Sequence, residues 1–399
     1  MKTKTLLLLL LLTQLACVKD DPIVIKEVEK FSEAHFTIFD SSPLRAEAAE
    51  LRPDGSLFIE GVGSANKDLT RNPFFLHLNS SHDPTSLKLI DYGDRFVYPV
   101  MDLIPSQDGH FIYLNQSIFE PDLEANIDLR KVTESGEILW EKRLAESSFR
   151  QQWPSLIELP NNDFLVIMNN WERSYLSKNF LIKCFTTDGE ELWSKEVEDD
   201  VVLITRKSFY LPVDESILIL AEVLDVDTEQ WSSQLFKLDL EGNLIDTKDV
   251  MDCNTIGFGS IDVKLLDDET ILLYYRTAEG VIISQFTSDL MEKSTIVFDE
   301  SIVSSPADVV KVSDGSLVVL TTGYDSNEDI DNHVFLTKIN CGEVLWKKRY
   351  GSPRSDAGVA LVERPNGNLV LIGRTQQDVE VGGTFNLFLV ETDAEGNPN

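Results

Sequence analysis

The chain has 399 residues, of which 42% are hydrophobic, so it can bury a sizeable core, and this composition excludes general disorder. Its 35 basic and 68 acidic residues give a net charge of −33, which repels nucleic acid and anionic lipid headgroups. The charge is typical of a soluble, self-repelling surface. Capture of cations or of a basic partner is the alternative interpretation.

Residues 1–17 predict a leader sequence that is not part of the fold. Lys2 and Lys4 precede a run of seven leucines, Leu6–Leu12, which is too short to span a bilayer as a mature helix. The Ala16-Cys17 pair resembles the lipobox of bacterial lipoproteins, although Gln14 stands where that family usually has Leu or Val. The resemblance implies that Cys17 is lipidated and becomes the N-terminus. Ordinary secretion with cleavage near Ala16 is the alternative.

Residues 18–34 have no clear period and are interpreted as a tether. Within them, Lys19-Asp20-Asp21 resembles the export tag of lipoproteins displayed on the surface of Bacteroidota-type bacteria. These two resemblances together imply an outer-membrane lipoprotein, lipid-anchored at the cell surface. The lipid anchor would then attach the protein to the membrane. The protein itself is expected to be a monomer or part of an envelope complex.

Residues 35–399 repeat a unit of about 53 residues, which is the mark of a repeat architecture. Each unit carries a first tight turn that favours a β-hairpin. These turns are predicted at Asp54-Gly55, Asp108-Gly109, Asn161-Asn162, Asp214-Glu215, Asp267-Asp268, Asp314-Gly315 and Asn366-Gly367. A second turn follows each of them, at Asn79-Ser80, Ser135-Gly136, Asp188-Gly189, Glu241-Gly242, Ser288-Asp289, Cys341-Gly342 and Glu395-Gly396.

Short strands rich in β-branched and aromatic residues lie between these turns, such as Leu317–Thr322 and Leu369–Gly373. Each unit therefore predicts four antiparallel strands joined by a tight turn, a longer polar loop and a second tight turn, which is a propeller blade. No long segment has a helical period. The sequence predicts an all-β, seven-bladed β-propeller over residues 35–399.

The two ends of the chain predict how the ring closes. The seventh unit stops after its second turn and lacks an outer strand, while an orphan strand, Ala34–Phe39, precedes the first unit. Pairing the orphan strand with the last blade removes an exposed edge. We therefore expect the N-terminal strand to close blade seven.

The outer strand of several units carries a tryptophan after the second turn, at Trp140, Trp193 and Trp346. A large side chain at this place is expected to pack between neighbouring blades. The segment GEVLWKKRYG, residues 342–351, has a turn glycine followed by a tryptophan. In this it resembles the seven-bladed repeat propellers of secreted bacterial lipoproteins, of PQQ-like or SBBP-like type. No vicinal cysteine pair or tryptophan-lined quinone site accompanies it, so no quinone is expected.

Two features are candidate binding sites, because loops on a rigid scaffold are where binding usually occurs. Alternating oxygen side chains resemble the start of a calcium loop, although Ile330 replaces the expected glycine and Leu336 the expected Glu. A solvated acidic loop is the alternative. These weak calcium ligands are Asp325, Asn327, Asp329 and Asp331. The second feature is a scatter of aromatic and arginine side chains suited to a glycan or peptide. Its members are Tyr98, Arg150, Trp153, Trp171, Arg206, Trp231, Tyr324 and Arg354.

No catalytic residue is predicted, because the five histidines are scattered and no GxSxG, HExxH or phosphate-binding motif occurs. The expected function is that of a non-catalytic binding or protein-interaction propeller, with calcium as the one cofactor suggested. Two alternatives stay open. One is a periplasm-facing scaffold of an outer-membrane complex, and the other is a carbohydrate-active propeller enzyme with two carboxylates near the centre of the ring.

Overall fold

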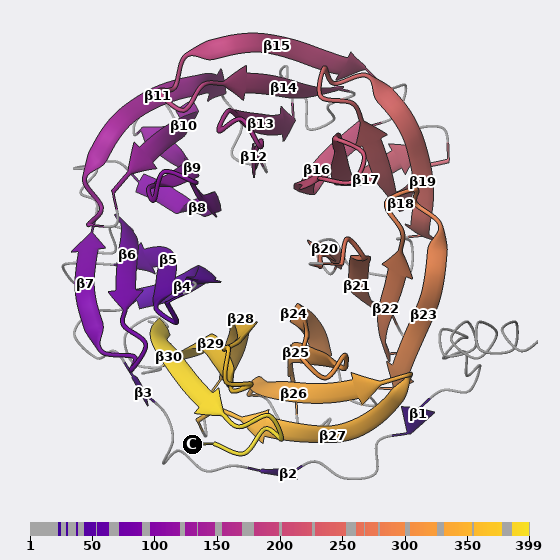
Figure 1. The fold of residues 1–399 in the computed structure, drawn as a ribbon. Helices are drawn as coiled ribbons and strands as arrows, with labels where there is room; N and C mark the ends of the chain where they lie inside the picture. The colour runs from indigo at the N-terminus through magenta and orange to yellow at the C-terminus, as the bar shows by residue number, and fades with distance from the viewer. Residues whose placement is uncertain are drawn as a thin grey trace, which may run out of the picture.

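The computed structural model is a ring of seven small antiparallel sheets (Figure 1). It describes residues 23–24, 29–30, 37–38, 44–52, 54–63, 72–89, 96–119, 124–133, 135–147, 154–169, 179–198, 202–225, 228–252, 261–266, 268–277, 280–299, 304–324, 331–352, 355–376 and 385–398. Within these ranges the secondary structure is strand and turn. No helix in the described part of the chain is long and apolar enough to cross a membrane. The prediction of a seven-bladed β-propeller is confirmed.

Blades are numbered in chain order, and in each the first strand lies innermost. Blade one holds β4 (Leu44–Leu51), β5 (Leu57–Gly63), β6 (Asn72–Leu78) and β7 (Pro84–Leu89). Blade two holds β8 (Phe96–Pro105), β9 (Phe111–Phe119), β10 (Glu124–Val132) and β11 (Ile138–Ser147). Blade three holds β12 (Ser155–Glu158), β13 (Phe164–Asn169), β14 (Asn179–Phe185) and β15 (Glu191–Glu198). Blade four holds β16 (Val202–Leu211), β17 (Ser216–Asp225), β18 (Gln230–Leu238) and β19 (Leu244–Asp252).

Three further blades complete the ring. Blade five holds β20 (Ile261–Leu265), β21 (Ile271–Thr277), β22 (Gly280–Phe286) and β23 (Glu292–Asp299). Blade six holds β24 (Ser304–Lys311), β25 (Leu317–Gly323), β26 (His333–Asn340) and β27 (Glu343–Tyr350). Blade seven holds β28 (Asp356–Glu363), β29 (Leu369–Gln376) and β30 (Phe385–Thr392), and its fourth strand is β3 (Thr37–Ile38).

The closure of blade seven follows the prediction from the chain ends. Thr37 pairs with Leu389 and Ile38 with Phe388 in an antiparallel register, so β3 supplies the outer strand. Two more short strands precede it on the rim. β2 (Glu29–Lys30) pairs in parallel with β27, and β1 (Ile23–Val24) pairs in parallel with β23. The N-terminal segment therefore contacts the rim at blades five, six and seven in turn, as Figure 1 shows.

The tight turns share one geometry. In blade one, Gly55 N–H donates to the Arg52 carbonyl at 2.9 Å, Arg52 N–H donates to the Ser56 carbonyl at 2.8 Å, and Gly55 has φ of 82°. A turn that ends in a left-handed residue suits a three-residue hairpin loop. Three turns fall one or two residues later than predicted, with left-handed residues at His82, Glu269 and Leu290.

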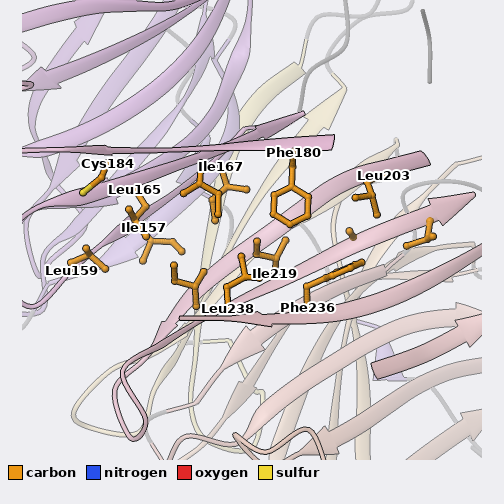
Figure 2. Packing of buried hydrophobic residues seen from close by; sticks show 14 residues of the cluster. Ile157, Leu159, Leu165, Ile167, Phe180, Cys184, Leu203, Ile219, Phe236 and Leu238 are labelled. Atoms are coloured by element: carbon orange, nitrogen blue, oxygen red, sulfur yellow. The ribbon is translucent and has the colours of Figure 1, made fainter. Parts of the chain in front are cut away.

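The tryptophans of the outer strands pack between blades, as predicted. The Trp140 indole N–H donates to the Thr187 carbonyl of blade three at 3.2 Å, and its ring stacks on Phe164 at 5.9 Å. Trp193 packs against the core shared by blades three and four, where Phe180 and Phe236 meet edge-on with ring centroids 6.0 Å apart (Figure 2). Burial of such side chains supplies most of the stability of the ring.

Lysines at one repeated position also join blades. The ammonium of Lys237 pairs with Asp214 of its own blade and donates to the Ser288 carbonyl of blade five at 2.9 Å. Lys131 makes the equivalent contacts with Asp108 and with Thr187 of blade three. Each lysine therefore closes a seam between neighbouring blades at the short-turn face, which is the face formed by the tight turns.

Two cysteines, Cys184 and Cys341, lie in the described part of the chain. Cys184 in β14 is a buried free thiol, and burial raises its pKa to about 11, so it is a poor nucleophile at neutral pH. Cys341, with φ of 48° in the second turn of blade six, is disulfide-bonded.

Candidate functional site

The residues predicted to bind a ligand are divided between described and undescribed parts of the chain. Cys17, Arg150, Trp153, Trp171, Arg354 and three of the calcium candidates, Asp325, Asn327 and Asp329, lie outside the described residues, as does the side chain of Tyr98. Arg206 and Trp231 lie on blade four, while Tyr324 and Asp331 flank a loop of blade six. Blade five separates the two pairs. In the described part of the chain, no group of three or more His, Cys, Asp or Glu side chains is placed to hold a metal ion.

Arg206 has a local partner within blade four. Its Nη2 lies 2.5 Å from Oε2 of Glu222 in the neighbouring strand β17. The side chains of Arg206 and Glu222 expose 14% and 4% of their surface, so little of either is open to solvent. Arg206 itself is the extra residue of a β-bulge, because Thr205 and Lys207 pair with consecutive residues of β17. The bulge turns the following residue, Lys207, to a new direction.

A set of ionisable side chains on the innermost strands is a stronger candidate. Asp102, Asp262 and Asp308 occupy the same position of the repeat, each four residues before the first residue of its tight turn. Lys207 and Lys264 lie beside them on β16 and β20. We call these five residues the axial cluster, because they come from innermost strands of blades two, four, five and six, which surround the centre of the ring (Figure 1).

Two of the three aspartates bind the backbone of the next blade. Oδ2 of Asp102 accepts a hydrogen bond from Leu156 N–H at 2.7 Å, and Oδ2 of Asp308 accepts one from Leu361 N–H at 2.9 Å. In each, Oδ1 accepts the N–H of the following residue, Leu103 or Val309. Burial raises the pKa of Asp102, and the hydrogen bond from Leu156 opposes that rise. Their role is to hold blades together.

Asp262 differs from its two counterparts. Its Oδ1 accepts Val263 N–H at 2.7 Å, but its Oδ2 accepts the Tyr274 hydroxyl at 3.0 Å instead of a backbone N–H of the next blade. Lys207 Nζ lies 3.6 Å from Oδ1 of Asp262. The backbone N–H that would correspond, that of Val309, is already bound by Asp308. Asp262 is therefore paired with a side chain of the preceding blade, whereas its two counterparts bind the backbone of the following blade.

Solvent reaches this pair. The side chains of Lys207 and Asp262 expose 40% and 38% of their surface, whereas Asp308 exposes 14%. Asp262 raises the pKa of Lys207, with smaller contributions from Asp308 and Asp102, so Lys207 is a cation at neutral pH. Burial and the charge of Asp262 raise the pKa of Tyr274 well above its usual range, so its hydroxyl stays protonated and donates. The carboxylate of Asp262, the ammonium of Lys207 and the hydroxyl of Tyr274 thus lie together on the inner strands.

The axial polar contacts continue around the ring. Ser208 of blade four donates from N–H and from its hydroxyl to Ser155 Oγ of blade three, at 3.1 and 2.7 Å. Lys264 Nζ of blade five lies 2.8 Å from Oδ1 of Asp308 in blade six. Burial raises the pKa of Glu50 of blade one, while Arg52 and Lys264 act to lower it. The candidate site is therefore supported by contacts from most of the blades.

The axial cluster was not predicted, because its residues lie within strands and form no continuous motif. A signal was present in the repeat itself. At one repeat position an aspartate lies between two apolar residues in three units. These segments are Met101-Asp102-Leu103, Ile261-Asp262-Val263 and Ala307-Asp308-Val309. A lone polar residue at the same place in three inner strands requires a partner near the axis. Alignment of the units by their turns would have shown it.

Comparison with known proteins supports the fold. No family model matches the sequence, and no curated protein matches it. A solved prolyl endopeptidase is 13% identical with a TM-score of 0.54, over 91% of this chain and 50% of that one. A solved puromycin hydrolase is 10% identical with a TM-score of 0.55, over 93% of this chain and 56% of that one. The chain thus spans about half the length of each, and this likeness shows the propeller fold alone.

The comparisons nevertheless correct one expectation. The sequence had predicted a non-catalytic binding propeller, and the two matched structures are those of an endopeptidase and a hydrolase. The prediction rested on the absence of local catalytic motifs. Such motifs are short continuous stretches, whereas the axial cluster is made of side chains from inner strands that are far apart in the chain. These neighbours contradict the prediction of a non-catalytic protein.

Proposed function

We propose that this protein is a hydrolase whose reaction takes place at the axis of the ring, with Asp262 as general base and Lys207 as the cation that stabilises developing negative charge. One observation carries the proposal. Of three aspartates at the same repeat position, Asp102 and Asp308 accept a backbone N–H of the next blade, whereas Oδ2 of Asp262 accepts the Tyr274 hydroxyl. Asp262 also lies 3.6 Å from Lys207, whose side chain is 40% exposed. A geometry held by side chains and open to water suits chemistry better than structure.

The proposed reaction attacks a carbonyl carbon. Asp262 takes a proton from a water molecule as the water oxygen forms a bond to that carbon. The carbonyl oxygen becomes an oxyanion, which Lys207 stabilises through its positive charge. Collapse of the intermediate breaks the bond to the leaving group, which takes the proton from Asp262. The hydrogen bond from Tyr274 fixes the carboxylate during both proton transfers, and the likeness to an endopeptidase and a hydrolase supports an acyl substrate.

The same proposal includes a place for the protein. We propose that Cys17 carries the lipid anchor and that the propeller is held at the outer membrane, on the cell surface. The seven leucines and the Ala16-Cys17 pair support this localisation. The membrane is then a partner through the anchor, and a calcium ion at Asp325, Asn327, Asp329 and Asp331 remains a proposal that the described residues do not test.

The experiment is a chromogenic screen of the purified full chain. Esters of p-nitrophenol, aminoacyl p-nitroanilides and p-nitrophenyl glycosides report on the three common hydrolytic reactions. We expect release from one acyl class. We also expect Asp262→Asn to reduce the rate by a factor on the order of 100 or more, since general bases contribute that much.

The matched control is Asp214→Asn, which removes an ion pair of similar kind at the short-turn face, outside the axial cluster. That variant is expected to lower stability and leave turnover unchanged. No release from any class by the folded wild type would contradict the proposal. So would release that Asp262→Asn does not alter.

A further inference from the structure

The seam between blade seven and blade one, which we call the closing seam, is held by other side chains than the seams described above. At the seams after blades two and four, Lys131 and Lys237 each bind a backbone carbonyl in the second turn of the next blade. At the same places of the repeat, the closing seam has Glu391 in blade seven and Ser80 in blade one. A carboxylate has acceptors only, so the carbonyl of Ser80 needs another donor.

Arg364 is that donor. It begins the first turn of blade seven, and its Nη1 donates to the carbonyl oxygen of Ser80. Its Nη2 makes a hydrogen bond with Nε2 of His82, which lies in the same turn of blade one as Ser80. The other ring nitrogen, Nδ1, lies 3.5 Å from Oε2 of Glu391, whose Oε1 accepts a hydrogen bond from Asn368 at 2.7 Å. Two side chains of blade seven therefore hold the imidazole of His82.

His82 stands at a backbone position that other blades give to glycine. Its φ is 64°, and its side chain is only 14% exposed. A residue with a Cβ is disfavoured in this left-handed conformation, because the Cβ comes too close to the following carbonyl oxygen. The corresponding residues of blades two, three, four and seven are Gly136, Gly189, Gly242 and Gly396. Blade one thus carries a side chain at a costly position, and this side chain meets blade seven.

The hydrogen bonds determine the protonation state of the imidazole. A guanidinium has donors and no acceptor, so Nε2 of His82 accepts from Arg364 and carries no proton. Uptake of a proton at Nε2 would remove this acceptor and place a positive ring against the guanidinium. Burial, followed by the charge of Arg364, lowers the pKa of His82 below its ordinary value of 6.5. The carboxylates of Glu391 and Asp83 attract a positive ring and oppose this shift without cancelling it.

We propose that the contact between His82 and Arg364 is an acid-sensitive latch, which holds the first blade to the last in neutral solution and is released by protonation of the imidazole. Because the pKa of His82 is lowered on folding, its contribution to stability is complete above pH 6.5 and is lost as the pH falls through the folded value. The contacts of Lys131 and Lys237 contain no imidazole. The loosening is therefore confined to the closing seam, and it is independent of the proposed hydrolase reaction.

The test uses the folded full chain and the variant His82→Gln. The amide oxygen of glutamine can replace Nε2 as the acceptor for Arg364, and it takes up no proton between pH 5 and pH 7.5. The matched control is His77→Gln, because His77 is also in blade one but its Nδ1 bonds to Thr85 Oγ1 of the same blade at 2.8 Å. Amide hydrogen exchange with mass spectrometry measures the protection of residues 79–83 and 364–368 at the closing seam. Residues 186–190 and 239–243, in the second turns of blades three and four, are the internal reference.

In the wild type and in His77→Gln, we expect the protection at the closing seam to fall by a factor on the order of 10 between pH 7.5 and pH 5, after correction for the intrinsic exchange rate. Loss of a hydrogen bond to a charged group has an effect of about this size. The reference turns should keep their protection in all three proteins, and His82→Gln should keep it at the closing seam as well.

Three outcomes of the exchange experiment would overturn the latch. They are unchanged protection in the wild type, an equal loss at the closing seam and the reference turns, and a loss that persists in His82→Gln. A titration of the wild-type imidazoles by nuclear magnetic resonance gives a check that requires no functional variant, with the missing signal of His82→Gln used only for assignment. A pKa of His82 at or above 6.5 would also refute the latch.

Discussion

The ammonium group of Lys338 lies 2.8 Å from Oδ2 of Asp314 and donates a hydrogen bond of 3.3 Å to the carbonyl oxygen of Ala394. It thereby joins blade six to blade seven, as Lys131 and Lys237 join earlier pairs. The hydrogen bond from Lys338 lowers the pKa of Asp314 to about 2. A carboxyl whose pKa is lowered on folding adds stability above its unfolded value of 3.8, and this contribution is lost as the pH falls toward 2.

Replacement of this lysine tests the seam. Lys338→Met removes a side chain that is only 5% exposed, and we expect it to cost about 1–3 kcal/mol of unfolding free energy, as buried charged hydrogen bonds do. Lys311→Met is the control, because Lys311 is 39% exposed in its pair with Asp268 and an exposed pair contributes about 0–1 kcal/mol. Urea denaturation of both variants measures the difference. Equal losses would show that the seam adds nothing beyond a surface ion pair.

The buried carboxyl of Asp356 is expected to make the free energy of unfolding depend on pH. It is 1% exposed at the start of β28, and burial raises its pKa to about 6 despite hydrogen bonds from Thr375 and Ser352. Since the folded pKa is above the unfolded value of 3.8, the folded state favours the protonated carboxyl. This contribution is complete below pH 3.8 and is lost as the pH rises through 6, at a cost of about 3 kcal/mol.

The Asp356→Asn variant isolates the contribution of this carboxyl to the free energy of unfolding. The amide keeps the acceptor for Ser352 N–H, which lies 2.7 Å from the carboxylate, and it has no charge to bury. We expect the variant to match the wild type near pH 4 and to be more stable at pH 7.5. Thermal unfolding of both proteins across this range gives the difference, and a constant difference in melting temperature would contradict the assignment.

Two glycines with the same backbone conformation separate strain from crowding. Gly396 has φ of 75° and Gly367 has φ of 84°. A Cβ on Gly396 would lie 2.9 Å from the Trp346 ring, whereas nothing lies within 4 Å of a Cβ on Gly367. Gly367→Ala is expected to cost about 1–2 kcal/mol, the penalty for a left-handed residue. Gly396→Ala should cost about 1–3 kcal/mol more, because the core is already full. Calorimetry of the two variants checks the order.

The closing strand can be removed by shortening the chain. A protein that begins at residue 33 keeps β3, and one that begins at residue 41 loses it. We expect the shorter protein to unfold at a lower urea concentration and to aggregate, because β30 then exposes an unpaired edge beside the apolar Phe388 and Leu389. Size-exclusion chromatography and denaturation compare the pair. Identical behaviour would show that β3 is dispensable.

Much of the fold could be predicted because the repeat supplies several copies of each signal. Turn glycines such as Gly55 and Gly189 mark positions that require a left-handed backbone, and the outer-strand tryptophans mark the seams. At His82 and Leu290, where the left-handed residue is not glycine, the predicted turn falls one or two residues early, although Asn162 and Glu215 lie where predicted. There the ladder register of the flanking strands, which a local motif does not reveal, determines the position of the turn.

The candidate site could not be predicted in the same way. The difference between Asp262 and Asp308 lies in what each second oxygen meets, Tyr274 in one case and Leu361 of the next blade in the other. Both residues read alike in the sequence, as an aspartate between apolar neighbours. Their roles depend on contacts between strands far apart in the chain, which only the closed ring creates.

The parallel and antiparallel pairings of the N-terminal segment set an order of assembly. β1, β2 and β3 emerge first from the ribosome, yet their partners end at residues 299, 350 and 392. β1 cannot dock before residue 299 of the 399 has been made, and β2 and β3 must wait still longer. Such long-range contacts form slowly. The ring therefore cannot close before its last blade exists, because β3 pairs with β30.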